Sequence, residues 1–148
     1  MLIDQIRADL ITATKAKDAL RQRTMRSAIA AVQEAQVSGA AATTLDDDGV
    51  QAVLKSQVKR RLDAAEAFDS GGAPDRAAAE RAEIEVLEEY LPASLSADEL
   101  EAIVAAVFAA NGFETKADMG NAMKAVNAEV AGRADGRAVA DLVKSRLS

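Results

Sequence analysis

The segment from 88 to 100, EEYLPASLSADEL, divides a sequence that otherwise has the periodicity of helices. Pro92 cannot donate a backbone hydrogen bond, and it moves the residue before it away from helical dihedral angles. We therefore expect the preceding helix to end at residue 90 or 91. Ser96 is a favourable N-cap, and Glu99, three residues later, completes a capping box. A new helix should begin directly after the turn, which predicts a long first part and a short second part.

The composition favours packed helices over strands. Hydrophobic residues make up 49% of the 148 positions, but aromatic residues make up only 3%, and two prolines interrupt the chain. Alanine and leucine favour helices, whereas strands are enriched in aromatic and β-branched residues. The fold class that we predict is therefore all-α.

Apolar positions spaced three and four residues apart predict seven helices in two groups. We expect a four-helix N-terminal domain over residues 1–92 and a compact three-helix C-terminal domain over 93–148. Between the second and third helices, residues 40–45 are predicted to form a mobile loop. The expected helices lie near 2–15, 19–37, 46–70, 75–90, 96–111, 115–130 and 135–147.

The absence of cysteine and histidine excludes several kinds of chemistry. Disulfides, catalytic thiols, Ser-His-Asp arrangements and nearly all zinc sites need these residues. We expect no metal and no cofactor. The first fifteen residues lack the apolar core of a signal peptide, and no apolar run is long enough to span a bilayer, so we expect a cytoplasmic protein without membrane contact. The net charge of −6 argues against nonspecific nucleic-acid binding.

Three charged residues fall on the apolar faces of their expected helices. On a helical wheel of about 100° per residue, Arg21, Arg61 and Glu80 all point where apolar side chains point. In one interpretation, Glu80 bridges the two arginines in a partly buried ion network, which must be well paired to be tolerated. In the other, the arginines line a cleft that receives an anion such as phosphate.

Four other basic residues are candidates for contacts with nucleic-acid phosphates. Lys55 and Lys59 lie one turn apart on the solvated side of the third helix. Arg133 and Arg137 flank the start of the last helix, where free backbone N–H groups also favour an anion. The alternative for both arginines is that they are solvated turn charges. The surrounding GRADG sequence lacks the longer glycine-rich loop and the Lys-Ser/Thr pair of a nucleotide phosphate loop.

Several short motifs together resemble the GatB/YqeY family over nearly the full length of the chain. They are AKD at 16–18, TMR at 24–26, VLKSQVKRR at 53–61, AEIEVLEEYLP at 82–92, DMGNAMKAV at 118–126 and GRADG at 132–136. The family comprises free-standing YqeY-like proteins, which this chain resembles, and the tail domain of the B subunit of glutamine-dependent aminoacyl-tRNA amidotransferase. The resemblance implies an all-helical, two-part fold and a tail domain that helps to hold tRNA.

The resemblance also implies a family-level activity class, carbon–nitrogen ligation with glutamine as nitrogen donor. We do not transfer catalysis to this chain, because the sequence has no Ser-Ser-Lys amidase pattern and no constellation of metal ligands. We predict a non-catalytic module that binds tRNA or a tRNA-handling assembly, through Lys55, Lys59, Arg133 and Arg137. Aminoacyl-tRNA synthetase or amidotransferase subunits are the expected protein partners. The alternatives are an accessory component of a ligase, active only with a partner subunit, and a protein–protein adaptor.

Overall fold

The computed structural model describes residues 1–39 and 43–148, so part of the predicted 40–45 loop lies outside the described residues. The described residues contain helices and no strand, which confirms the all-α prediction. Contacts divide the chain into two compact units, Met1–Leu91 and Pro92–Ser148, which are described separately below. The helices are α1 (Leu2–Lys15), α2 (Ala19–Val37), α3 (Asp47–Ser70), α4 (Pro74–Glu88), α5 (Ala97–Asn111), the 3₁₀ helix η1 (Lys116–Asp118), α6 (Met119–Val130) and α7 (Gly136–Arg146).

Side-chain caps fix where the helices of the N-terminal unit begin. The Asp18 carboxylate accepts a hydrogen bond from the backbone N–H of Arg21 at 3.1 Å, and Asp46 accepts one from Gly49 at 2.8 Å. These bonds satisfy N–H groups that the first turn of a helix leaves without a partner. α4 begins instead with Pro74, whose missing N–H costs nothing at that position.

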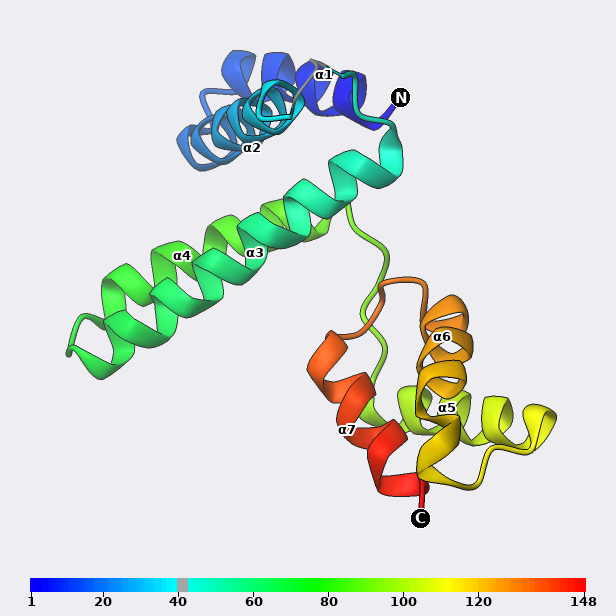
Figure 1. Cartoon of the computed structure of the whole chain (residues 1–148). Coiled ribbons are helices and arrows are strands. Elements are labelled where there is room, and N and C mark those ends of the chain that lie inside the picture. Colours follow the sequence, from blue (N-terminus) through cyan, green and yellow to red (C-terminus); the bar gives the residue numbers. More distant parts are fainter. Residues whose placement is uncertain (40–42) are drawn as a thin grey trace. The chain divides into compact units, whose positions relative to one another are not determined.

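The N-terminal core lies where α1 and α2 pack onto the α3–α4 pair. α3 and α4 run side by side, and one end of this pair extends beyond α1 and α2 (Figure 1). The buried apolar side chains of this core are Ile3, Ile6, Ala13, Met25, Ala28, Val32, Val50, Leu54, Val86, Leu87 and Tyr90. The spacing of apolar residues in the helix expected near 46–70 places Leu62 on an apolar stripe, but Leu62 is 46% exposed, so the burial that this position predicts is wrong. The extended end of the pair gives α3 a single neighbouring helix, which cannot cover the whole stripe.

The segment around Pro92 stops α4 slightly earlier than expected. α4 ends at Glu88, and the N–H groups of Tyr90 and Leu91 close a turn by donating to the carbonyls of Leu87 and Glu88. Tyr90 is buried, and its hydroxyl donates a hydrogen bond to Asp9 of α1. The side chain of Tyr90 therefore ties the end of α4 to the first helix.

The C-terminal unit packs α6 against α5 and α7. The predicted capping box of α5 is present: Glu99 N donates to Ser96 Oγ at 3.1 Å, and Ser96 N donates to the Glu99 carboxylate at 2.9 Å. The core residues of this unit are Leu100, Val104, Val107, Phe108, Ala122, Val126, Val130, Val139, Val143 and Leu147. This core holds the three helices together without any ion pair among the described residues of the unit.

Two helix starts in the C-terminal unit differ in detail from the prediction. The helix expected near 115–130 does begin with a capping box of Thr115 and Asp118, but its first turn is the 3₁₀ helix η1, and α6 itself begins at Met119. α7 begins at Gly136, yet the Asp135 side chain makes no capping hydrogen bond. The backbone carbonyl of Asp135 accepts the first hydrogen bond of α7, from Val139 N at 3.1 Å.

Candidate functional site

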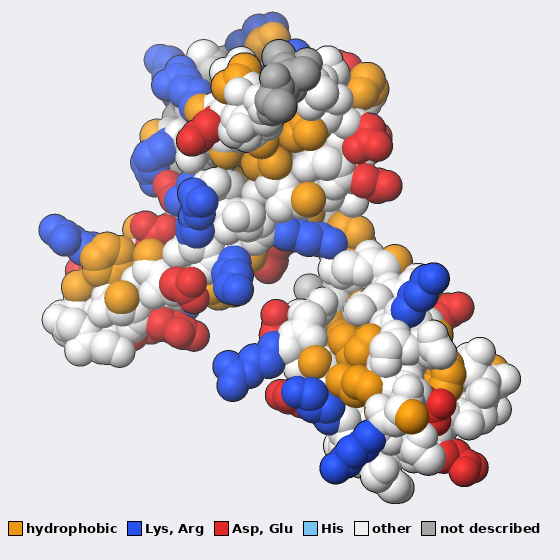
Figure 2. Space-filling model, viewed as in Figure 1, with side chains coloured by type: hydrophobic (Ala, Val, Ile, Leu, Met, Phe, Trp, Pro, Cys, Tyr) orange, Lys and Arg blue, Asp and Glu red, His pale blue; other side chains and the backbone are white. Residues whose placement is uncertain are grey.

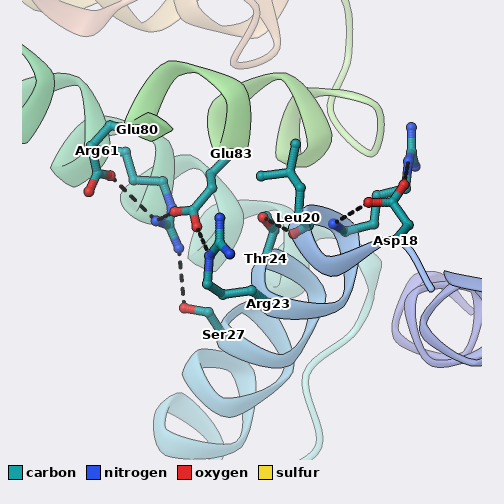
Figure 3. Close-up of polar contacts among 9 residues, drawn as sticks. Asp18, Leu20, Arg23, Thr24, Ser27, Arg61, Glu80 and Glu83 are labelled. Carbon is teal, nitrogen blue, oxygen red and sulfur yellow. Dashed lines mark hydrogen bonds and ion pairs between the residues drawn. The ribbon is translucent and has the colours of Figure 1, made fainter. Parts of the chain in front are cut away.

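Arg61 of α3 lies at the centre of a partly buried ion network in the N-terminal unit. Its Nη1 contacts Glu83 of α4 and lies 3.5 Å from Glu80, while Nη2 donates to Ser27 Oγ of α2 at 3.2 Å. Glu83 also accepts from Arg23 Nε at 2.7 Å (Figure 3). The network therefore joins three helices through two arginines and two carboxylates whose charges balance.

Glu83 is the most enclosed carboxylate of this network. Its side chain is 10% exposed, compared with 26% for Glu80, and Arg61 is 15% exposed. Arg23 remains 60% exposed and reaches Glu83 from the surface. A buried charge without a partner is strongly destabilising, so this pairing supports the structural interpretation of Arg61 over an open anion cleft.

Arg21 does not join this network, contrary to the predicted bridge through Glu80. Its guanidinium makes a two-pronged contact with Glu89, at 2.9 Å from Nη1 and 2.5 Å from Nη2, and Nε lies 3.6 Å from Asp18. The hydrogen bond and the charge of Glu89 raise the pKa of Arg21 above its ordinary value. Arg21 precedes Arg23 and Ser27 along α2, so its side chain lies nearer to the C-terminal end of α4. It therefore pairs there with Glu89, about two helical turns after Glu83.

The sequence contained the signal for Glu83, which we missed. Glu83 lies three residues after Glu80 and one before the buried Ile84, so about 100° per residue places it on the inner face of α4. Exposed Arg23 could not have been assigned in the same way, since only the length of its side chain brings it to the network.

Lys55 and Lys59 share one side of α3, as the spacing predicted. Lys59 is exposed and Lys55 is half-buried, and neither takes part in the ion pairs found among the described residues. The next residues on the same side of α3 as the two lysines are the exposed Leu62 and then Glu66. The positively charged part of this side is therefore short, with about 6 Å between the two lysines along the helix axis.

The wider charge distribution shows no single basic surface on the visible face. Lys and Arg side chains of the N-terminal unit are spread among Asp and Glu side chains (Figure 2). This mixture agrees with the acidic net charge of −6. The visible face of this unit therefore offers a polyanion separate groups of basic side chains.

Arg133 and Arg137 have different environments within the C-terminal unit. Arg133 is half-buried and folds back on α6, donating from Nε to the Val130 carbonyl at 2.9 Å and from Nη2 to the Glu129 carbonyl at 2.8 Å. It therefore caps the C-terminal end of α6, where the helix dipole favours a positive charge. Arg137 is exposed in the first turn of α7. The predicted pair thus divides into one capping residue and one surface residue.

Within 1–39 and 43–148, no group of three or more Asp and Glu side chains has the arrangement of a metal site. None of the helices in those ranges combines the length and the apolar character needed to cross a membrane. The ion pairs of Arg21, Arg23, Arg61 and Arg81 with glutamate or aspartate of another segment join helices to one another. They therefore explain stability and do not by themselves indicate a reaction.

Comparison with protein-family models identifies the family of this chain. The family model described as Yqey-like protein matches residues 3–147, which is nearly the whole chain. No curated protein matches the sequence. Because the match includes both compact units and every helix but the first residue of α1, the chain belongs to the YqeY-like family.

Proposed function

We propose that this chain is a non-catalytic helical module that binds tRNA or a tRNA-handling assembly. The observation that carries the proposal is the Lys55–Lys59 pair on α3, of which Lys59 is exposed and Lys55 half-buried, and neither of which takes part in the ion pairs found in the described residues. Membership of the YqeY-like family supports it, through the resemblance to the tail domain of the amidotransferase B subunit. The lack of cysteine and histidine supports a binding role over a catalytic one.

The contacts would be made with phosphates rather than with base edges. Two lysines one turn apart can meet neighbouring phosphates as flexible point charges. The chain has three Phe, one Tyr and no Trp, and Tyr90 is buried, so few aromatic side chains can stack on bases. We therefore propose recognition of shape and backbone, with weak binding that depends steeply on salt.

Arg137 remains part of the proposal, and Arg133 takes a reduced role. The guanidinium of Arg133 already satisfies two carbonyls at the end of α6, so a phosphate would have to compete with these hydrogen bonds. Replacing Arg133 should lower the stability of the C-terminal unit as well as any affinity. Replacing Arg137 should affect affinity alone, since its side chain is exposed.

The test is a salt titration of tRNA binding to the full chain. The Lys55→Ala, Lys59→Ala variant should bind all tRNAs more weakly and reduce the salt slope by about two, which is about one per phosphate contact. The matched control is Lys15→Ala, Lys124→Ala, which removes the same charge from two exposed lysines elsewhere. If both variants lose affinity equally, the effect is one of net charge, and the assignment to α3 is wrong.

A second assay distinguishes a non-catalytic binding module from the alternative role, an accessory component of a carbon–nitrogen ligase. Purified chain is incubated with glutamine, ATP and mischarged tRNA, with and without added amidotransferase subunits. The proposal predicts no amide formation by the chain alone. Amide formation by the lone chain would contradict a non-catalytic role, and formation only with the added subunits and this chain together would favour the accessory component.

A further inference from the structure

A hollow of about 350 Å³ lies on the C-terminal unit at the junction of η1, the start of α6 and the end of α7. Lys116, Met119, Lys144 and Leu147 line it. Met119 and Leu147 supply an apolar floor that belongs to the core of this unit, while both lysines are exposed. The hollow therefore combines an apolar surface with two ammonium groups.

Backbone hydrogen bonds fix the walls of this hollow. Ser148 N donates to the Glu114 carbonyl at 3.0 Å, and Lys116 N donates to the Ser148 carbonyl at 3.3 Å, so the end of α7 is tied to the segment before η1. The Asp118 carboxylate holds the same turn by accepting from the N–H groups of Glu114 and Thr115, each at 2.9 Å. A ligand would thus meet a surface that is already formed, which reduces the entropic cost of binding.

Neither of the two lysines forms an ion pair with another group of the unit, and neither occurs among the ion pairs found in 1–39 and 43–148. On the visible face of this unit, hydrophobic side chains gather in the middle, and Lys and Arg side chains lie around them together with some Asp and Glu side chains (Figure 2). The complement of such a surface is an apolar group with carboxylates beside it.

We propose that this hollow docks an acidic peptide segment of a partner protein, with a large apolar side chain seated between Lys116 and Lys144. Small-molecule sites bury most of their ligand, which needs a deeper enclosure than four side chains open to solvent provide. A polypeptide segment does not depend on such enclosure, because only one side chain enters the hollow. Its neighbouring carboxylates then pair with the lysines at the rim.

The experiment uses the full ¹⁵N-labelled chain and a ten-residue peptide with Glu-Leu-Phe-Glu at its centre. Binding should shift the amide signals of the four lining residues and saturate. A peptide with Gln-Leu-Phe-Gln at its centre should bind more weakly, and so should Lys116→Gln, Lys144→Gln, each by about fivefold for two surface ion pairs. Lys124→Gln is the control, since it makes the same change about 140° around α6 from Met119.

Three outcomes would overturn the proposal. The first is equal binding of both peptides or of the double variant, because the lysines would then not recognise the carboxylates. The second is saturable binding of decanoate at this hollow without binding of the acidic peptide, which would assign it to a small amphiphile. The third is concentration-dependent self-association that shifts the same four signals, which would make a second copy of the chain the occupant.

Discussion

Replacing Glu83 by Gln should destabilise the N-terminal unit more than any other single charge removal on α4. The change leaves Arg61, which is 15% exposed, without its closer carboxylate, so that only Glu80, 3.5 Å from Nη1, remains. Breaking a buried ion pair from one side typically costs about 3–5 kcal/mol, and partial exposure here places the estimate near the lower end, at about 3 kcal/mol. Glu80→Gln should cost less than about 1 kcal/mol, because Glu80 is 26% exposed and 3.5 Å from Arg61.

Urea unfolding measures these differences with two signals. Circular dichroism follows all helices, and the emission of Tyr90 follows the N-terminal unit alone, since the chain has one Tyr and no Trp. A loss of about 3 kcal/mol corresponds to a melting temperature lower by about 6–12 °C if the whole chain unfolds together, and by about twice as much if the N-terminal unit unfolds alone. Glu85→Gln is the matched control on the exposed side of α4.

A combined variant tests whether burial is the cause. Arg61→Met with Glu83→Leu removes the two most enclosed charges and should be more stable than Glu83→Gln alone, because the partners left behind, Glu80 and Arg23, are 26% and 60% exposed. The reasoning is refuted if Glu83→Gln behaves like the Glu85→Gln control. It is also refuted if Glu80→Gln proves the more damaging change.

Three further predictions concern the caps and the titrating groups. Ser96→Ala should cost about 1 kcal/mol of stability, as the loss of an N-cap usually does. If residues 93–148 form a separate domain, the rate of hydrogen exchange should rise only in those residues. An equal rise in both units would contradict a separate domain. Backbone N–H groups of Glu114 and Thr115 hold the pKa of Asp118 below its ordinary value of 3.8. The stability that the Asp118 carboxylate contributes is therefore complete above pH 3.8 and is lost as the pH falls through the lowered pKa. The stability difference between the native chain and Asp118→Asn should shrink below about pH 4, and a constant difference would contradict the assignment. Burial, and then the hydrogen bond to Asp9, raise the pKa of Tyr90 above its ordinary value of 10.0. The stability that the Tyr90 hydroxyl contributes is therefore complete below pH 10.0 and is lost as the pH rises through the raised pKa. Tyr90→Phe should cost about 1.5 kcal/mol of stability near neutral pH and less in alkali, as urea unfolding at several pH values would show.

The helices were predictable because local signals mark their ends. Asp18, Asp46 and Ser96 each cap the helix that their position indicated, and Gly112 ends α5 in the left-handed region, at φ 68°, where glycine carries no steric penalty. Such signals act within a few residues along the chain. They need no knowledge of which helices become neighbours.

The pairing of charges was predictable only in part, because it depends on tertiary contacts. A helical wheel indicates that Arg61 and Glu80 face inward, but it cannot choose between Glu80 and Glu83 as the closer partner. It also cannot show that Arg21 lies level with Glu89. The same limit applies to Arg133, which the sequence placed at a helix end without indicating that its guanidinium caps α6.

The most direct test of the proposed function is recovery of RNA on the full chain from cell extract, with and without prior RNase treatment. The native chain should enrich tRNA over ribosomal RNA at low salt, and the Lys55→Ala, Lys59→Ala variant should enrich it less than the Lys15→Ala, Lys124→Ala control. Recovery of no tRNA at low salt would contradict the account. Protein partners that remain bound after RNase, in the absence of any tRNA, would show instead that the chain is an adaptor.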